Sequence, residues 1–375
     1  MKITIRTAKP LAGLAALMAA GITSQAQYVF TELEYPGVPF GSTYANGIDG
    51  ANIVGAYWDT NNVSHGFLYN ATNWSTLDAP GASSASGQGT TPFGISGTNI
   101  VGTYTDSKGV NHGFLYNLTT QTWTRLDYPL AGTGTGQGTW AFATSGANIV
   151  GYDYDSGGNE HGFLYTGGNW ITLNAPGAGK ASGQGTEPLG ISESTIAGTY
   201  IDSSGNENGF LYNMVTTNWT KLDDPAATTW TGVGGISGTN VSGAYWDGSD
   251  AYGFVYNGRT WTTLRDPLAP VGQYPSGGTF GHGISGDAIV GAYYNGSGLH
   301  GFVATPIPQL AITQSTNGPT ISWPLNPFVG WTLQQNPDLN TTNWMSIGGV
   351  STDGTNNFVT ITPAPGNAFF RLNHK

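Results

Sequence analysis

Short runs of apolar residues, separated by polar turn residues, recur along most of the chain at an interval of about 47 residues. The copy at residues 94–129 shows the pattern clearly. β-Branched and aromatic residues at 100–104, 112–116 and 123–126 predict three strands, because such side chains suit a half-buried pleated surface. Residues 91–95 offer a fourth strand ahead of them. The pattern therefore predicts a repeating unit of four antiparallel strands.

Turn residues between these runs support the same interpretation. Asp106 can cap a reverse turn with its carboxylate, and Gly109 can take the positive φ that such a turn requires. Pro129 ends the last strand, because proline has no N–H to donate to a ladder. Glycines also recur in the middle of the predicted strands, as at Gly102 and Gly113. They indicate that neighbouring sheets or aromatic rings press against bare backbone there.

Counting the copies predicts how the fold closes. The Gly-Ile-Ser motif begins at equivalent positions in six copies, namely Gly47, Gly94, Ala143, Gly190, Gly235 and Gly283. A tryptophan strand follows in five of them, at Trp74, Trp123, Trp170, Trp219 and Trp261. Residues 30–36 (FTELEYP) align with residues 123–129 (WTRLDYP), so the first strand of the chain can supply the missing piece. We therefore predict an all-β fold over residues 27–305: a six-bladed β-propeller closed by its N-terminal strand, because closure removes free sheet edges.

Both ends of the chain differ from the repeats. Residues 1–26 are predicted to be a signal peptide, with basic residues at the start, an apolar run at 11–22 and cleavage after Ala26. That run is too short to span a bilayer, so the mature protein is predicted to be soluble and secreted. Residues 306–309 are predicted to be a stiff linker, and short apolar runs predict a small β-sandwich accessory domain at 310–375.

Composition narrows the classes of partner. The net charge is −11, which argues against nucleic acid and anionic membranes, because phosphate binding requires clustered Lys and Arg. Charged residues make up only 9% of the chain, so surface polarity must come from Asn, Thr, Ser and Gly. The absence of cysteine excludes disulfides and thiol chemistry. The sequence has no nucleotide-binding loop, serine-hydrolase elbow or zinc motif, so no catalytic residue, metal site or cofactor is predicted.

With its repeats aligned, the N-terminal domain resembles the bacterial HAF family of extracellular repeats. The matching string is Gly-Ile-Ser, then Ile-Val-Gly-x-Tyr-x-Asp, then His-x-Phe-Leu-Tyr, and it recurs over residues 44–303. The family has Ala between His and Phe, whereas this chain has Gly. The resemblance implies export and a repeated β-fold, and it supplies no catalytic residues. The tail resembles a C-terminal β-module of secreted bacterial proteins, which implies display or attachment.

Histidine and aspartate recur at equivalent points, which favours local structural roles. The histidines are His65, His112, His161 and His300. The ring spreads them too far apart to share one metal, and each is predicted to bond partners within its own repeat. The aspartates, predicted to cap turns, are Asp59, Asp106, Asp155, Asp202 and Asp247. The alternative is a ring of carboxylates that holds Ca²⁺ or sugar hydroxyls.

Residues that break the repeat are better candidates for a ligand site. The loops that connect one copy to the next vary most, and in propellers such loops converge on the axis. The candidates in or beside them are Gln88, Gln137, Trp140, Lys180, Gln184, Glu187, Trp230, Tyr274 and His282. Aromatic and amide side chains with few charges suit stacking on sugar rings and hydrogen bonds to hydroxyls.

The sequence therefore predicts a secreted, non-catalytic protein that binds extracellular polysaccharide or protein at the loop face of the propeller. An enzyme that acts on polysaccharide is one alternative, with Glu187, His282 and the ring aspartates as its candidates. A purely structural surface protein is the other. The sequence identifies neither the ligand nor the oligomeric state.

Overall fold

The computed structural model describes residues 3–6, 28–39, 41–270, 272, 277–315, 318–362 and 367–374. Every regular element in these ranges is a β-strand, so the predicted all-β class is confirmed. Within the same ranges, no helical segment has the length and hydropathy of a membrane crossing. Apart from residues 3–6, the predicted signal peptide lies outside the described residues. Contacts divide the chain into two compact units, Phe30–Ala304 and a second one made of Met1–Val29 with Thr305–Lys375.

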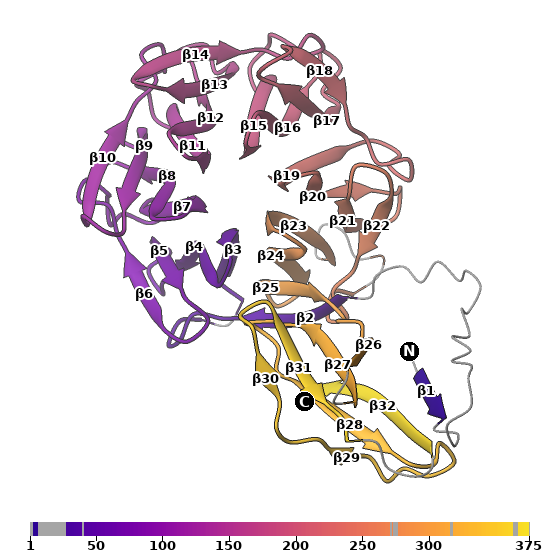
Figure 1. The fold of residues 1–375 in the computed structure, drawn as a ribbon. Coiled ribbons are helices and arrows are strands. Elements are labelled where there is room, and N and C mark those ends of the chain that lie inside the picture. Colours follow the sequence, from indigo (N-terminus) through magenta and orange to yellow (C-terminus); the bar gives the residue numbers. More distant parts are fainter. Residues whose placement is uncertain are drawn as a thin grey trace. The chain divides into compact units, whose positions relative to one another are not determined.

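The unit Phe30–Ala304, called the repeat unit below, consists of antiparallel four-stranded meanders, one for each sequence repeat (Figure 1). The first repeat forms β3 (Thr43–Asp49), β4 (Asn52–Trp58), β5 (Ser64–Tyr69) and β6 (Trp74–Leu77). The second forms β7 (Thr90–Ser96), β8 (Asn99–Thr105), β9 (Asn111–Asn117) and β10 (Thr122–Leu126). The third forms β11 (Gly138–Ser145), β12 (Asn148–Tyr154), β13 (Glu160–Thr166) and β14 (Asn169–Leu173).

The later repeats follow the same order. The fourth forms β15 (Gly185–Ser192), β16 (Thr195–Ile201), β17 (Glu207–Asn213) and β18 (Asn218–Lys221). The fifth forms β19 (Thr231–Ser237), β20 (Asn240–Trp246), β21 (Ala251–Tyr256) and β22 (Trp261–Leu264). The sixth forms β23 (Gly277–Ser285), β24 (Ala288–Asn295) and β25 (Leu299–Pro306). β25 continues to Pro306, so the first residue of the predicted linker lies in a strand.

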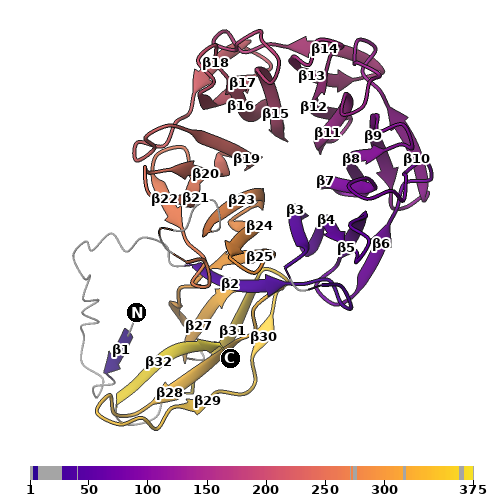
Figure 2. The same cartoon turned by 180° about the vertical axis from the view of Figure 1, so that it is seen from behind.

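The N-terminal strand β2 (Tyr28–Leu33) belongs to the sheet of the sixth repeat. The strand order in that sheet is β2-β25-β24-β23. Figures 1 and 2 show β2 beside β25, on the side of the sheet opposite to β23. This is the place that the alignment of residues 30–36 with residues 123–129 assigns to it.

Neighbouring meanders also touch where each inner strand begins. A parallel pair joins Asn111 to Gly138, and an equivalent pair joins the third and fourth repeats, so three meanders form one twelve-stranded sheet. A parallel bridge between Ser42 and Leu299 joins the first repeat to the last. In the described part of the chain each sheet keeps edge strands, so none closes on itself through hydrogen bonds.

Hydrophobic cores lie between the faces of neighbouring meanders. One cluster joins Val101 and Leu126 of the second repeat to Ile149 and Phe163 of the third. Within each sheet a buried phenylalanine packs against the tryptophan of the last strand, with ring centroids 4.9 Å apart in each of the first five repeats. Aromatic pairs at this separation stabilise a fold beyond the area that they bury.

The mid-strand glycines are required by close packing, as the sequence predicts. A Cβ atom on Gly102 would lie 2.3 Å from the carbonyl oxygen of Thr91 and 2.6 Å from Cζ of Phe114. Both distances are shorter than any tolerated contact, so only glycine fits without a shift of backbone or ring. The presence of the aromatic ring confirms the predicted reason for this glycine.

The second unit contains two four-stranded sheets that share one core. One sheet has the order β26-β27-β31-β30, from β26 (Ala311–Ser315), β27 (Gly318–Pro324), β30 (Ser351–Thr352) and β31 (Asn356–Thr360). The other has the order β1-β32-β28-β29, from β1 (Ile3–Arg6), β28 (Trp331–Asn336), β29 (Met345–Ser346) and β32 (Asn367–His374). Trp323 of the first sheet and Phe370 of the second are buried in the same cluster.

Candidate functional site

Each innermost strand of the repeat unit carries a β-bulge at the same place. In β7, for example, the pairing with β8 jumps from Pro92 to Gly94, which leaves Phe93 without a partner in the register. The inner strands of four other repeats show the same shift, and in β23 the gap in the pairing runs from Gly281 to Ile284, which includes His282. The residues set free in this way, called the bulge ring below, are Asn46, Phe93, Phe142, Leu189, Gly234 and His282. A bulge redirects its side chain, and here all six residues line one cavity.

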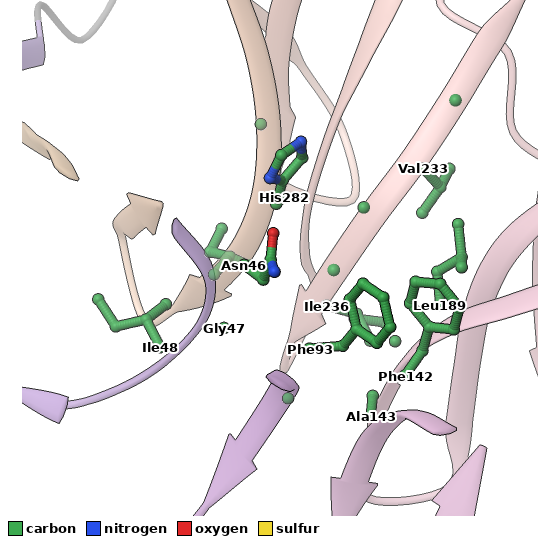
Figure 3. Close-up of a pocket in the computed structure, with 18 of the residues that line it drawn as sticks. Asn46, Gly47, Ile48, Phe93, Phe142, Ala143, Leu189, Val233, Ile236 and His282 are labelled. Atoms are coloured by element: carbon green, nitrogen blue, oxygen red, sulfur yellow. The ribbon is translucent and has the colours of Figure 1, made fainter. Parts of the chain in front are cut away.

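This axial cavity has a volume of about 720 Å³ and lies where the inner strands of the repeats converge (Figures 1 and 3). Pockets of about 300–1,000 Å³ with apolar walls and a few polar groups are typical of small-molecule sites. The cavity has this character, because backbone and apolar side chains form most of its wall. Beyond the bulge ring, Glu207 and Trp230 also line it.

One side of the cavity is aromatic and aliphatic. The rings of Phe93 and Phe142 are stacked, with centroids 4.2 Å apart and an interplanar angle of 19°. Leu189 follows them in the next repeat, and Figure 3 shows all three on the same side. Gly234 adds no side chain, because a Cβ there would lie 2.4 Å from the carbonyl oxygen of Gly281. The bulge ring thus leaves open space at Gly234, beside the apolar wall of the cavity.

The facing side is polar, and its hydrogen bonds fix which atoms can meet a ligand (Figure 3). Nδ1 of His282 lies 3.0 Å from the carbonyl oxygen of Ala45. A carbonyl oxygen only accepts, so Nδ1 carries the proton, and burial lowers the pKa of His282 and favours the neutral ring. Nε2 is then an acceptor. Asn46 donates its Nδ2 to the carbonyl oxygen of Pro92 at 2.9 Å, which leaves its Oδ1 as a second acceptor.

A row of interacting carboxyl groups begins at Glu207, which lines the cavity with Trp230, and continues outside the cavity lining with Glu187 and Glu160. Glu160 of β13 is 3% exposed and accepts a hydrogen bond from the Tyr154 hydroxyl at 2.8 Å. Burial, and then the neighbouring carboxyls of Glu160 and Glu207, raise the pKa of Glu187 well above its usual range. Burial, and then Glu160, also raise the pKa of Glu207. Carboxyls held together in this way retain protons, so they can donate hydrogen bonds at a pH where ordinary carboxylates only accept.

The structure brings two of the predicted site residues into the cavity, Trp230 and His282. Glu187 adjoins the cavity through its interaction with Glu207. Trp140 does not line it, and instead stacks on Tyr152 with ring centroids 5.6 Å apart.

The predicted glutamines lie in their own loops. Oε1 of Gln137 accepts from the Gly134 N–H at 2.9 Å, and Oε1 of Gln184 accepts from the Ala181 N–H at 3.2 Å. Oε1 of Gln88 is buried and has no hydrogen-bond partner in the described part of the chain. Lys180 lines a separate pocket with Glu160 and His161. Tyr274 lies outside the described residues.

Sequence reasoning missed most of the bulge ring. Asn46, Phe93, Phe142 and Leu189 each stand directly before the repeated Gly-Ile-Ser position. The sequence feature that could have identified these residues is a position that varies between copies of a motif whose other positions repeat. It was overlooked because we sought variation in the connecting loops, where insertions are tolerated, and not within strands.

The recurring histidines and aspartates have local partners, as predicted. His112 lies between Asp106 and Asp127, at 3.3 Å on Nε2 and 3.1 Å on Nδ1. Asp59 accepts from the backbone N–H groups of Asn61 at 2.8 Å and Val63 at 2.9 Å. The N–H of Val63 lowers the pKa of Asp59. These carboxylates are engaged in turn capping and in holding histidine.

Comparison with known proteins gives only distant structural similarities. No protein family model matches the chain, and no curated relative matches it. Among solved structures it is similar to the β-propeller domain of the Trilobed protease from Pyrococcus furiosus, at 9% identity and a TM-score of 0.41, covering 71% of this chain and 96% of that chain. It is also similar to TolB from Acinetobacter baumannii, at 12% identity and a TM-score of 0.42, covering 72% of this chain and 66% of that chain. A third similar structure is the fucose-specific lectin from Aleuria aurantia, at 14% identity and a TM-score of 0.43, covering 77% of this chain and 93% of that chain.

Proposed function

We propose that this protein is a non-catalytic binding protein of the extracellular space, and that its ligand enters the axial cavity of a six-bladed propeller. The observation that carries the proposal is the bulge ring. Six equivalent positions in a repeated frame hold five kinds of residue, and all six positions line one cavity of about 720 Å³. A structural repeat alone gives no reason for this variety.

The propeller architecture is part of the proposal. It is supported by the order β2-β25-β24-β23, in which the first strand of the repeat unit lies beside the last. It is also supported by contacts between the first and last repeats: the Ser42–Leu299 bridge and the bond from the Gly50 N–H to Ser285 Oγ at 3.2 Å. A ring joined by its first strand leaves only short, protected sheet edges.

A neutral polyhydroxylated ligand, such as the end of an extracellular polysaccharide, suits the chemistry of the cavity. Phe93 and Phe142, stacked on each other with Tyr152 stacked on Phe142 in turn, form an apolar wall. His282 Nε2 and Asn46 Oδ1 offer acceptors to hydroxyl groups. The carboxyl of Glu207, whose pKa is raised by burial, adds a polar group near Trp230. Among the residues that the structure describes, no Lys or Arg lines the cavity, which disfavours an anionic ligand.

Secretion is the remaining part of the proposal. It is supported by the basic start, apolar run and small residues before the expected cleavage site at Ala26, and by the resemblance to extracellular HAF repeats. Sequencing the N-terminus of the protein recovered outside the producing cells tests it. The expected first residue is Gln27, and a chain retained inside with Met1 intact would contradict export.

A glycan array probed with the mature protein tests the ligand class, and tryptophan fluorescence titration measures affinity for any sugar that binds. We expect Phe142→Ala to weaken binding by about tenfold, because it removes one ring of the apolar wall and the support that this ring gives to Phe93. Gln137→Ala, which changes a loop residue outside the cavity, is the matched control and should bind as the wild type does. A blank array would remove polysaccharide as the ligand class. Loss of binding in Gln137→Ala alone would move the site to the loop face.

A polysaccharide-active enzyme is the second candidate, and one observation favours it. Glu160, Glu187 and Glu207 form a carboxyl row beside Trp230, and raised carboxyl pKa values are what a general acid requires. Incubation with polysaccharides, followed by an assay for new reducing ends or unsaturated products, distinguishes the binding protein from the enzyme. Under the binding proposal no product forms. Product that disappears in Glu187→Gln would support the enzyme.

A further inference from the structure

The strand that joins the two ends of the repeat unit brings an unusual set of side chains together. Glu32 lies on β2, Glu34 directly follows β2, and His300 lies on β25. We call these three residues the seam site. One ligand atom from each lies within 4.8 Å of those from the others. The seam site thus links the first strand of the repeat unit to the last one in sequence.

The spacing of the three atoms is close to that around a small metal ion. Nδ1 of His300 lies 2.7 Å from Oε1 of Glu34 and 3.4 Å from Oε1 of Glu32. Zinc bound tetrahedrally to nitrogen and oxygen ligands at about 2.1 Å places those ligands about 3.3 Å apart. Small side-chain rotations would therefore admit a metal between the three atoms.

The other nitrogen of the imidazole is already committed as a donor. Nε2 of His300 lies 3.1 Å from Oδ1 of Asn295. That oxygen also accepts from the Ser297 N–H at 3.0 Å, which fixes the orientation of the amide. Nε2 therefore carries a proton. In the structure Nδ1 donates to the Glu34 carboxylate, and a bound metal ion would displace that proton and take its place on Nδ1. Metal-bound histidines are typically oriented in this way, by a hydrogen bond from the nitrogen that does not bind metal.

The seam site differs from the equivalent histidine sites in its charge. In the second repeat, which holds His112, the position of Glu32 is Arg125, and Arg125 forms an ion pair with Asp127. At the seam this basic residue is replaced by an acid. Asp266 is also buried nearby, and burial raises its pKa most. Glu32 raises the pKa of Asp266 further and His300 lowers it, so both lie close enough to interact with it. Oε2 of Glu34 is buried and has no hydrogen-bond partner in the described part of the chain. Negative charge therefore exceeds positive charge here.

The arrangement around His112 shows why the other repeats are poor metal sites. There Asp106 meets Nε2 and Asp127 meets Nδ1, so the two carboxylates lie on opposite edges of the ring. No single point can contact the imidazole and both carboxylates. At the seam Asn295 takes the place of the outer acid, and both carboxylates face Nδ1.

We propose that Glu32, Glu34 and His300 bind a divalent cation of the zinc class, and that this ion clamps β2 onto β25. A nitrogen ligand with two carboxylates suits zinc and similar transition metals, whereas Ca²⁺ prefers oxygen alone. The Glu32 side chain is 36% exposed, so an ion can enter from solvent and keep water as a further ligand. The Tyr293 hydroxyl, which donates to Oε1 of Glu32 at 2.9 Å, orients that carboxylate.

Calorimetric titration of the EDTA-treated, dialysed protein with ZnCl₂ and with CaCl₂ tests the proposal. We expect one equivalent of Zn²⁺ to bind, no comparable binding of Ca²⁺, and a higher melting temperature with Zn²⁺. Glu32→Gln retains an acceptor for Tyr293 and should weaken Zn²⁺ binding by at least about 100-fold. Asp78→Asn is the matched control, because Asp78 holds His65 at 2.9 Å in the first repeat, and it should leave Zn²⁺ affinity unchanged.

Absence of a bound equivalent, equal affinity in Glu32→Gln, or preference for Ca²⁺ would overturn the proposal. Equal affinity would mean that Zn²⁺ binds histidines elsewhere. If Glu32→Gln does not fold, the visible spectrum of the wild-type protein with CoCl₂ tests whether the protein binds the metal tetrahedrally. Strong tetrahedral bands at one equivalent support the site, and a spectrum of hydrated Co²⁺ alone refutes it. Each outcome is independent of whether the axial cavity binds a sugar.

Discussion

Gly102 illustrates how strongly single residues are constrained in this fold. Its missing side chain lets the carbonyl oxygen of Thr91 and the ring of Phe114 approach the backbone from two directions. The same arrangement recurs in the other repeats, with Gly151 between Trp140 and Phe163 as one example. The repeated glycine therefore reflects a steric requirement of the sheet, and it is not a sign of flexibility.

We expect Gly102→Val to destabilise the protein by about 1–3 kcal/mol or more, because the added atoms overlap a carbonyl oxygen and an aromatic ring. Urea unfolding followed by fluorescence measures the change. Gly348→Val is the control, because no atom lies within 4 Å of the position of its Cβ. Equal midpoints for both variants and the wild type would show that Gly102 is not tightly packed.

At the residue scale, sequence reasoning succeeded where a side chain has local partners. The position of His112 between turn and strand acids follows from the repeat itself, so its bonding was predictable. The role of Gln137 was not, because its amide reaches back to the Gly134 N–H, and a loop of Gly, Ser and Thr gives no sign of that contact. The lining of the cavity also depends on atoms that are distant in sequence.

At the scale of the strand, β12 departs from the pattern of its equivalents. Asp153 stands where the other repeats have a tyrosine, the example in the second repeat being Tyr104. Its side chain is 0% exposed, and neither carboxylate oxygen has a hydrogen-bond partner in the described part of the chain. Burial raises its pKa from 3.8 to about 7, partly offset by His161. A strand that is regular in backbone thus contains one poorly accommodated group.

The raised pKa of Asp153 predicts that the stability of the protein depends on pH. A carboxyl with a higher pKa in the folded chain binds protons more tightly there, so its favourable contribution is full below pH 3.8 and is lost as the pH rises to about 7. We expect Asp153→Asn to flatten the fall in unfolding free energy across that window and to stabilise the protein at pH 8 by about 2 kcal/mol or more. Urea unfolding at several pH values measures both effects. Asp287→Asn, which removes the same charge from an exposed side chain, should reproduce neither.

The strands themselves were largely predictable, and their irregularities were not. Apolar and aromatic runs placed β8, β9 and β10 within a residue or two of their observed bounds. A bulge adds one residue to one strand of a pair, and alternation of apolar and polar residues does not reveal it when glycine and alanine surround it. The axial cavity was therefore hidden, because it is built from bulges.

At the scale of the whole molecule, β2 is the strand whose position decides the architecture. It is separated from β25 by most of the repeat unit, so its pairing requires the ends of a long chain to meet. Alignment predicted this pairing, because Leu33 occupies the place of Leu126 in the repeat. The second unit was less predictable, since β1 lies in the segment predicted to be a signal peptide and β30 is only two residues long.

Leu33 and Leu126 provide a direct test of that equivalence, since each is 4% exposed. We expect Leu33→Ala and Leu126→Ala to lower the unfolding free energy by similar amounts, about 2–4 kcal/mol each, because each removes a buried side chain from an equivalent core. Chemical unfolding of the two variants side by side measures this. A neutral Leu33→Ala beside a destabilising Leu126→Ala would separate β2 from the folded repeats.

The bulge ring has a consequence for how new specificities can arise. Each of its residues stands at a point where the ladder makes no cross-strand pair, so exchanging one leaves the hydrogen bonds of the ladder in place. Exchange of Asn46 or His282 removes only a side-chain hydrogen bond to a neighbouring carbonyl oxygen. A combinatorial library randomised at Asn46, Phe93, Phe142, Leu189 and His282 would therefore sample many chemically distinct interiors on one unchanged scaffold. Related chains that share the frame can diverge in what they recognise through these few interchangeable positions.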